Sequence, residues 1–484
     1  MELSLEESFW ILLVVAIIAW YVYDKYVQRE HQLLVNYPII GRLRYLLEEF
    51  REPFRQYFGD EKFYESKDKL DWVYKAARDL PNYASFSPAQ PLPKPKFMIR
   101  HANIVLNDNE VENSFEVIFG ERRRKPFISK SIIARSAMSD GSISPEGTRA
   151  FVQGSFIGGF PINSGEGGVT SNFFVTHENY DSKYMTIVDS SSLNKSIKRV
   201  AKFLFNGAIA ADVYRKLVFK NDPEAETYIL DMNKKQFYRP NWDAPLEVFP
   251  KEVPSDMPDI VFQISSGLYG TRDKNGKFDA HRYQKVMSFC QMTEIKIAQG
   301  AKQTGGKLSG QKVTPAIAYY RNVEAYKDVF SPNRFPYANS IEELFDFIGT
   351  LQELSGKPVG MKIVISDMQN IEPYAKEIKR RVDLGIDAYP DYITLDSGSG
   401  GSATAPLEMM ERVGLNVRDS VYLVNKVLTD YGVRDKVRIV ASGKILTPDD
   451  IIIVMSLGAD FLQIARGFMM SAGCIQARYC SGTT

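Results

Sequence analysis

Eight short apolar runs, each leading into Gly, Ser or Asp, recur between residues 131 and 467. They are SIIARSAM (131–138), GGFPINSG (158–165), DIVFQISSG (259–267), EIKIAQG (294–300), VGMKIVIS (359–366), DYITLDSG (391–398), KVRIVASG (436–443) and DFLQIARG (460–467). Strands that are apolar along their whole length belong to parallel sheets whose faces are covered by helices. Longer helical stretches separate these runs. The sequence therefore predicts an α/β fold in which helices alternate with parallel strands.

The number of runs selects between the two common parallel architectures. Eight strand–helix units over about 340 residues fit a (β/α)8 TIM barrel with insertions, in which polar residues at the strand ends form the catalytic face. A doubly wound sheet is the alternative, but no G-x-G-x-x-G turn follows the first strand. We therefore predict a TIM barrel over residues 126–484.

The loops after the last three runs have the composition of a phosphate site. The glycines of LDSGSGGSATAP (395–406) allow backbone N–H groups to approach an anion closely, and its Ser and Thr residues add hydroxyl donors. A flexible surface loop is the alternative. The next two loops begin with A-S-G and A-R-G, and barrels commonly bind a phosphate between the loops after strands seven and eight. Together these loops indicate a phosphorylated cofactor.

Charge and residue content disfavour several other functions. The formal net charge of +1 gives no reason to expect a nucleic-acid partner. The three cysteines, Cys290, Cys474 and Cys480, do not make a disulfide framework and indicate a reducing compartment. Four histidines are present, none in an H-x-x-x-H pair, which disfavours a zinc hydrolase.

The N-terminus carries an apolar run of different character. SFWILLVVAIIAWYVY (8–23) has no charged residue and has tryptophans near its ends. The acidic residues before it and the missing small-x-small motif argue against a cleaved signal peptide. Lys25 and Arg29 follow it, so the positive-inside rule places the rest of the chain in the cytoplasm. A buried or interfacial helix is the alternative. We predict a transmembrane helix over residues 8–24 and an accessory or linker region over residues 25–125.

Seven blocks of the barrel region together resemble one family. They are AMSDGSISPEG, NSGEGG, EIKIAQGAK, KVTPAIAYYR, GMKIVIS, LDSGSGGSATAP and GADFLQIARGFMMSAGCIQARYC. Their order and spacing over residues 125–484 are similar to the FMN-binding synthase domain of glutamate synthase. With its apolar N-terminus, the chain resembles the stand-alone, membrane-anchored FMN-binding glutamate synthase-like proteins of bacteria. The resemblance implies an oxidoreductase acting on CH–NH2 donors, with FMN as cofactor.

The resemblance also implies the residues that contact FMN. In the family, the loop after the first strand lies against the flavin, and a lysine on strand five, here Lys362, approaches the flavin pyrimidine. A cation there stabilises negative charge on the reduced ring. A barrel-lining lysine paired with a carboxylate is the alternative for Lys362. The implied set is Ala137, Met138, Ser139, Lys362, Asp396, Gly400, Gly401, Ser442, Gly443, Ala465 and Arg466.

A site for 2-oxoglutarate follows from the same resemblance. Gln299, Lys302 and Arg321 match the family's dicarboxylate-binding residues, where Arg offers one carboxylate a bidentate fork and Lys supplies a point charge. Condensation with ammonia would give 2-iminoglutarate, which then receives a hydride to become glutamate. Glu166 lies in a loop that the family places over this site. Lys302 and Glu166 are thus the implied catalytic residues, with backbone capping as the alternative for Glu166.

The cysteine pair near the C-terminus matches part of the family's [3Fe-4S] site, which has the spacing C-x5-C-x4-C. Cys474 and Cys480 match the first two ligands, and the third would fall directly after Thr484. We therefore expect an incomplete ligand set in a chain truncated at its C-terminus. Two unrelated buried thiols are the alternative. Cys290 is expected to be a small buried hydrophobic side chain.

The sequence departs from the family pattern at two places. The family has a glutamine shortly after the A-Q-G-A-K block, where the nearest residue here is Lys307, and a His-Asp pair where this chain has Ser397 and Gly398. The resemblance implies that both places lie near the substrate. A related enzyme reducing another 2-oxo acid or an imine is therefore an alternative, and an electron-relay flavoprotein is a non-catalytic one.

The expected partners follow from what the sequence lacks. It begins MELSLEE rather than with the cysteine of a glutaminase domain, so ammonia is expected from solution or from a partner glutaminase. No dinucleotide-binding motif is visible, so a ferredoxin or a reductase is expected as electron donor. We expect a single-pass membrane protein whose catalytic barrel faces the cytoplasm.

Overall fold

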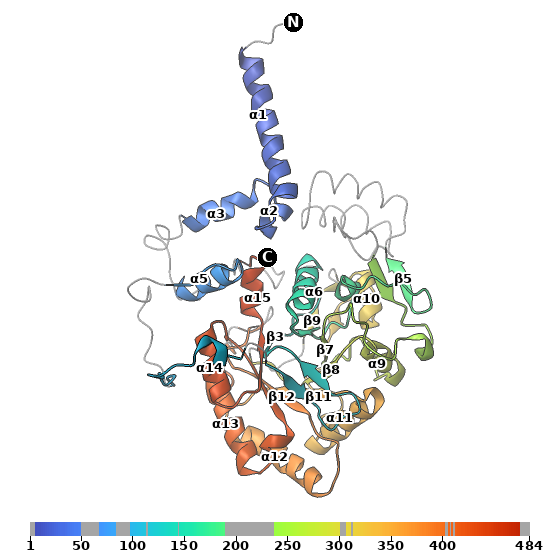
Figure 1. Ribbon diagram of the computed structural model, residues 1–484. Helices are drawn as coiled ribbons and strands as arrows, with labels where there is room; N and C mark the ends of the chain where they lie inside the picture. The colour runs from blue at the N-terminus through green and yellow to red at the C-terminus, as the bar shows by residue number, and fades with distance from the viewer. Residues whose placement is uncertain are drawn as a thin grey trace. The chain divides into compact units, whose positions relative to one another are not determined.

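The computed structural model of this 484-residue chain describes residues 5–49, 67–83, 97–112, 115–143, 145–188, 237–300, 306–310, 313–401, 405–406, 408–409 and 412–474. The chain forms two compact units, and Figure 1 shows their helices and strands. The first unit comprises Met1–Pro91, Val188–Gln236 and Met470–Gln476. The second comprises Leu92–Ile187, Phe237–Met469 and Ala477–Thr484, and it contains the barrel.

The predicted barrel is confirmed. Its strands are β3 (Ile133–Arg135), β4 (Ile162–Asn163), β7 (Ile260–Ile264), β8 (Met292–Lys296), β11 (Val359–Ile363), β12 (Tyr392–Asp396), β13 (Arg438–Ser442) and β14 (Phe461–Ile464). They form a closed ring in the order β11-β12-β13-β14-β3-β4-β7-β8, and neighbouring strands run parallel. Seven of the strands lie within the apolar runs, and β8 begins two residues before its run, at Met292.

Helices connect the strands and cover the barrel. They are α6 (Pro145–Gly158), α9 (Ala280–Met287), α10 (Pro315–Arg321), α11 (Ile341–Ser355), α12 (Met368–Asp383), α13 (Val417–Asp430), α14 (Pro448–Ser456) and α15 (Arg466–Ser471). Five of them begin where a polar side chain accepts a hydrogen bond from the backbone N–H three residues later, which satisfies a donor of the first turn. The capping residues are Asp279, Thr314, Ser340, Asp367 and Asn416. Two-stranded sheets pair β5 (Met185–Val188) with β6 (Phe237–Pro240) and β9 (Lys307–Leu308) with β10 (Val329–Phe330).

A hydrophobic cluster closes the amino-terminal end of the barrel. The hairpin of β1 (Val117–Phe119) and β2 (Phe127–Ser129) contributes Phe119 and Phe127 to it. The Phe119 ring meets the rings of Tyr392 and Phe461 edge-on, with centroids 5.4 and 5.2 Å apart. The other members are residues of four more barrel strands, namely Ala134, Val261, Met292 and Val440. Because the amino-terminal end of the barrel is closed by this cluster, a functional site is expected at the carboxyl end.

A layer of buried polar side chains lies above this hydrophobic cluster. Its residues occupy the next inward-facing strand positions toward the carboxyl end of the barrel. At its centre, Glu294 on β8 is fully buried. Its Oε1 accepts hydrogen bonds from Asn163 Nδ2 (2.9 Å) and Gln263 Nε2 (2.7 Å). Its Oε2 accepts from Thr394 Oγ1 (2.5 Å) and Gln463 Nε2 (3.1 Å). Because four donors match the lone pairs of one carboxylate, Glu294 joins side chains from five strands, its own included.

A buried lysine makes the stability of the barrel depend on pH. Lys357, two residues after the end of α11, is 6% exposed, and its Nζ donates to the carbonyl oxygens of Met287 (2.8 Å) and Cys290 (2.6 Å). Burial lowers the pKa of Lys357 to about 8. From about pH 8 to about pH 10.4 the unfolded chain therefore binds a proton that the folded protein has lost, and folding becomes more favourable as pH rises.

We expect the native protein to gain up to about 3 kcal/mol of stability relative to a Lys357→Met variant between about pH 7.5 and about pH 10. The variant cannot titrate here, and the cost of its two unpaired carbonyl groups is the same at both pH values. Denaturant unfolding of both proteins in detergent measures this difference. Parallel pH profiles for the two proteins would show that burial does not disfavour the charged lysine.

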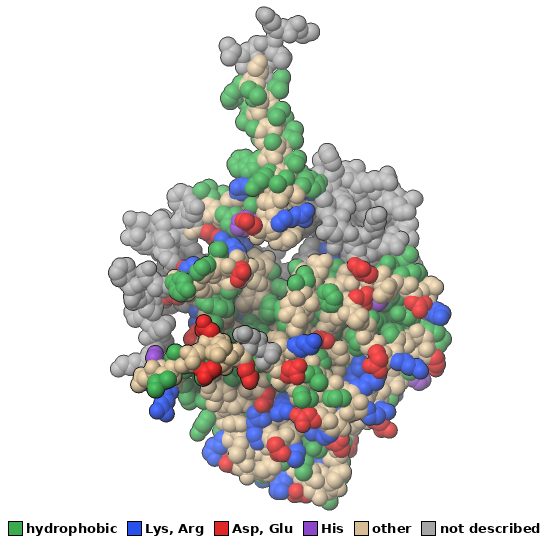
Figure 2. All heavy atoms as spheres, in the orientation of Figure 1, with side chains coloured by type: hydrophobic (Ala, Val, Ile, Leu, Met, Phe, Trp, Pro, Cys, Tyr) green, Lys and Arg blue, Asp and Glu red, His purple; other side chains and the backbone are tan. Residues whose placement is uncertain are grey.

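The first unit begins with an apolar helix. α1 (Leu5–Val22) continues as a short π-helix, η1 (Tyr23–Val27), and α2 (Gln32–Asn36), α3 (Gly41–Glu49) and α5 (Lys67–Ala76) follow. Within the described part of the chain, Ser8–Val27 is the one segment long and apolar enough to cross a membrane, with 20 residues, a mean hydropathy of 1.6 and 11% of it buried. Figure 2 shows its hydrophobic side chains along the exposed helix. By length and composition it matches the helix predicted over residues 8–24.

Candidate functional site

The predicted site residues that the structure describes, apart from Cys474, lie at or beyond the carboxyl ends of barrel strands. Those predicted for the cofactor belong to β11, β12, β13, β14 and β3, which are consecutive in the ring, or to the loops after them. The residues predicted to bind 2-oxoglutarate follow β4 and β8, in the part of the ring formed by β4, β7 and β8. We call these groups of strand ends the cofactor arc (β11 to β14 and β3) and the acid arc (β4, β7 and β8). The two predicted sets therefore fall on separate, continuous parts of one ring.

Lys362 and Asp396 lie side by side in the cofactor arc. Lys362 Nζ is 3.7 Å from Asp396 Oδ2, and both side chains are buried. The same carboxylate oxygen accepts a hydrogen bond from the backbone N–H of Gly300 (3.3 Å). Burial raises the pKa of Asp396 above its usual value, and the positive charge of Lys362 opposes that shift. Lys362 therefore has a carboxylate partner, as expected of a barrel-lining structural lysine. Its position at the end of β11 also suits contact with a cofactor.

Two glycines of the ring stand where no other residue fits without movement. Gly443 has a φ of +122°, and a Cβ on it would lie 2.1 Å from Ser397 Oγ. Gly165 has a φ of +68°, and its Cβ would lie 2.5 Å from the backbone nitrogen of Ser139. Ser397 Oγ is itself buried, and no described residue forms a hydrogen bond with it. A buried hydroxyl of this kind is a polar group that a bound ligand could satisfy.

The chemistry of the cofactor arc fits a phosphorylated flavin. A Cβ on Gly401 would lie 4.0 Å from the guanidinium of Arg466, so a glycine-rich loop and a cation are adjacent. Ser442 Oγ lies 3.4 Å from Ser136 Oγ at the ends of β13 and β3. Backbone N–H groups, serine hydroxyls and arginine are the groups that bind phosphate. With Lys362 on β11, the residues present fit FMN.

Arg321 ends α10 and directs its guanidinium toward the loop after β4. Its Nη2 is 3.1 Å from the position of a Cβ on Gly167, and its guanidinium carbon is 5.2 Å from the ring centre of Tyr269. The side chain is 6% exposed, and Nε has no hydrogen-bond partner within the described part of the chain. Burial lowers the pKa of Arg321, and Tyr269, Glu166 and Asp140 oppose this. Such an arginine is suited to bind a carboxylate.

Lys296, at the end of β8, is a site residue missing from the predicted set. Its Nζ lies 3.0 Å from Glu166 Oε2. Its positive charge also opposes the rise in the pKa of Asp396, so it is close to both arcs. The run E-I-K could have predicted Lys296 as a site residue, because residues two apart in a strand face the same side. Glu294 points into the barrel, and Lys296 is the next inward position toward the carboxyl end.

Comparison with known proteins identifies the family. The model described as "Conserved region in glutamate synthase" matches residues 84–484. The chain belongs to the glutamate synthase family. This confirms the family predicted from the sequence and makes the chain a member of an oxidoreductase family.

Relatives named as glutamate synthases match different lengths of the chain. The glutamate synthase large subunit-like protein YerD of Bacillus subtilis is 28% identical over 518 aligned positions, which cover 98% of this chain and 82% of that protein. The archaeal-type glutamate synthase (NADPH) of Thermotoga maritima is 32% identical over 234 residues, 48% of this chain and 42% of that protein. A solved mandelate oxidase variant with an FMN adduct has 12% identity over 89% of each chain and a TM-score of 0.36, which adds nothing to the barrel topology.

Some residues predicted for this member of the glutamate synthase family lie outside the described residues. They include Lys302 and Cys480, whose roles stay predictions. Cys474 is half-buried, and no group of three His, Cys, Asp or Glu side chains in the described ranges could bind a metal ion, so the [3Fe-4S] cluster also stays a prediction. Cys290 is fully buried, as predicted, and burial raises the pKa of its thiol to about 12.

The positions that depart from the glutamate synthase pattern have local explanations. A Cβ on Gly398 would lie 2.3 Å from the carbonyl oxygen of Gly414, so the backbone here leaves no space for a side chain. The Gly398 N–H donates to the carbonyl of Leu415 (2.7 Å), which fixes this close approach. Lys307 is largely exposed and forms an ion pair with Asp328 (2.7 Å). The altered sixth loop is therefore packed against the chain that follows it.

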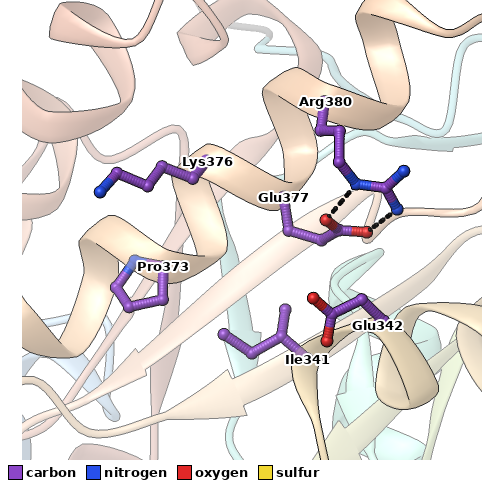
Figure 3. A pocket seen from close by; sticks show the side chains of 6 residues that line it. All are labelled: Ile341, Glu342, Pro373, Lys376, Glu377 and Arg380. Carbon is purple, nitrogen blue, oxygen red and sulfur yellow. Dashed lines mark hydrogen bonds and ion pairs between the residues drawn. The ribbon is translucent and has the colours of Figure 1, made fainter.

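A surface hollow of about 370 Å³ lies between α11 and α12. Figure 3 shows Arg380 and Glu377 facing each other on its wall, where their side chains form an ion pair (2.6 Å). It is lined by Ile341, Glu342, Pro373, Lys376, Glu377 and Arg380. All six residues belong to helices that cover the barrel and none to a strand end, so we do not assign this hollow to the glutamate synthase site.

Proposed function

We propose that this protein is a membrane-anchored, FMN-dependent enzyme that forms L-glutamate by reductive amination of 2-oxoglutarate. One observation carries the proposal most strongly. In the acid arc, Glu166 lies beside the ammonium group of Lys296 and near the buried guanidinium of Arg321, next to an arc whose loops fit a phosphorylated flavin. The family supports the class of reaction, because its relatives are named as glutamate synthases.

The two carboxylates of 2-oxoglutarate call for two cationic partners. Arg321 would bind one carboxylate through its guanidinium fork, because its Nε is buried without a partner among the described residues. Lys302 would bind the other carboxylate, with Lys296 close to the keto group. Gln299 Nε2 donates to the carbonyl oxygen of Gly401 (2.9 Å), which links the acid-binding loop to the glycine-rich loop of the cofactor arc.

Glu166 and Lys296 would move the protons of the condensation. When ammonia adds to the keto carbon, a C–N bond forms and the oxygen leaves as water, so nitrogen loses protons and oxygen gains them. A carboxylate and an ammonium group 3.0 Å apart can perform both transfers. We assign Glu166 as the group that accepts a proton from nitrogen. Lys296 Nζ would donate one to the departing oxygen.

When bound in the cofactor arc, FMN supplies the hydride that completes the reduction of the imine. The backbone of Ala137, Met138 and Ser139 would lie along the flavin, and Lys362 would face the edge that becomes negative on reduction. The glycines and Arg466 of the later loops would bind the phosphate. Asp396 would keep Lys362 in place through their 3.7 Å contact.

The other reactants would come from outside the barrel. We propose that ammonia arrives from solution or from a partner glutaminase. A ferredoxin or a reductase would supply the electrons, through an iron–sulfur cluster bound by Cys474, Cys480 and a third thiolate. Ser8–Val27 would cross the membrane once, and Lys25 and Arg29 support a cytoplasmic position for the barrel.

Anaerobic photoreduction of the 484-residue chain in detergent tests this function. We expect FMN to be released on denaturation, and the photoreduced flavin to reoxidise only when 2-oxoglutarate and ammonium are both present, with glutamate as product. Reoxidation by a different 2-oxo acid or imine would establish the alternative substrate instead. Flavin that stays reduced with all of these acceptors would leave electron relay as the function. A preparation without FMN would overturn the cofactor assignment.

A further inference from the structure

The helix α3 turns its apolar face away from the rest of the first unit. Ile40, directly before the helix, is 68% exposed, and Leu43, Leu46 and Leu47 are 53%, 50% and 49% exposed. Their spacing of three and four residues places them on one side of the helix. A surface helix in water ordinarily packs its apolar stripe against the core and exposes its polar side. The orientation of α3 is the reverse of that.

The opposite, largely polar face of α3 makes the contacts with the rest of the first unit. The Tyr45 ring lies against the His31 ring, with centroids 4.7 Å apart. Arg44 Nη1 donates to the carbonyl oxygen of Gly473 (2.9 Å), and its guanidinium lies 5.4 Å from the ring centre of Tyr74. These contacts fix the rotation of α3 about its own axis. The contacts of Tyr45 and Arg44 therefore determine that the leucines point outward.

An ion pair between Arg42 and a buried carboxylate joins the start of α3 to the end of the apolar segment that begins with α1. Asp24 is fully buried, and its carboxylate accepts hydrogen bonds from Arg42 Nε (3.0 Å) and from the Ile39 backbone N–H (3.0 Å). The guanidinium of Arg42 also lies 5.2 Å from the ring centre of Trp20. The first turn of α3 is therefore attached at the level where α1 ends, and Figure 1 shows α3 leaving that point sideways.

We propose that α3 lies in the headgroup region of the bilayer with its apolar face in contact with lipid. This inference rests on the proposed membrane span. The 18 residues of α1 extend about 27 Å, close to the hydrocarbon thickness of a bilayer, so the end of α1 reaches the membrane–water interface. Tryptophan and tyrosine concentrate at that level, and amphipathic helices bind there with their apolar face inserted. Lipid covers Ile40, Leu43, Leu46 and Leu47 in this arrangement.

Depth-dependent fluorescence quenching in liposomes tests the proposal. In the 484-residue chain with Cys474 and Cys480 replaced by serine, single cysteines would be placed at Leu43, at Leu46 and at Glu48 and labelled with an environment-sensitive dye. The buried Cys290 does not compete for the label. Glu48 is the matched control, because it lies on the contact face of the same helix and pairs with Arg44 (3.2 Å). A label at Ile17→Cys reports on α1 separately.

We expect lipids with a nitroxide near the headgroup to quench most of the emission from Leu43→Cys and Leu46→Cys, and little of that from Glu48→Cys. Lipids with a nitroxide deep in the acyl chain should quench Ile17→Cys. If Ile17→Cys is quenched while both leucine positions respond only to a water-soluble quencher, the anchor stands and the α3 proposal fails. If Ile17→Cys is not quenched by lipid, the membrane span itself fails. Leucine positions protected from both quenchers would show that protein covers this face, which also overturns the proposal.

Discussion

Replacing Arg321 with methionine is expected to lower kcat/KM for 2-oxoglutarate by about 10²–10³-fold, because loss of one partner of a desolvated charge pair costs about 3–4 kcal/mol. Methionine has nearly the length of arginine and can pack against Tyr269 in its place. It has no group that binds a carboxylate. Steady-state kinetics with 2-oxoglutarate and ammonium measure the effect, and FMN content shows whether the cofactor arc is intact.

Two further variants decide whether the effect of Arg321→Met comes from recognition of the acid. Arg321→Lys keeps the charge but not the bidentate fork, so we expect an intermediate loss of about tenfold. Arg380→Met makes the same change on the outer surface of α12, where Arg380 pairs with Glu377 (2.6 Å), and should leave the kinetics unchanged. Equal kinetics for Arg321→Met and the native protein would remove Arg321 from the acid site. A loss of FMN in that variant would assign it a structural role instead.

The barrel could be predicted because each of its strands is buried on both faces and reads as an apolar run. That pattern also revealed the loops with phosphate-binding composition, because strand ends of a barrel share one face. The order of the strands in the ring was harder to predict from the sequence. β3 and β14 are neighbours in space but lie near opposite ends of the barrel sequence, and the cofactor arc depends on that closure.

Long-range pairing of charged side chains was not visible in the sequence. Lys296 and Glu166 are far apart along the chain and meet at 3.0 Å only because β4 and β8 end on the same face. The outward orientation of the apolar face of α3 could not be predicted from the sequence for a different reason. Periodicity identifies an amphipathic helix but does not say which face meets the protein, and the contacts of Arg44 and Tyr45 decide that.

Glu294 is the position in the barrel interior where truncation should be most damaging. We expect Glu294→Ala to destabilise the barrel by about 3–5 kcal/mol, because it leaves a cavity and removes the shared acceptor of four buried donors. Those donors come from Asn163, Gln263, Thr394 and Gln463, on four different strands. Denaturant unfolding in detergent at neutral pH measures the loss.

Glu294→Gln separates the hydrogen-bond network from the charge of the carboxylate. The amide has the same shape, and two neighbours can adapt to its new donor. The Thr394 hydroxyl can rotate to accept, and Gln463 Oε1, which is buried without a partner in the described part of the barrel, can accept after its amide turns over. We therefore expect a cost below about 1.5 kcal/mol for this variant. If glutamine is as damaging as alanine, the negative charge itself is required beneath Lys362 and Asp396. If neither variant is destabilised, this polar layer does not contribute to folding.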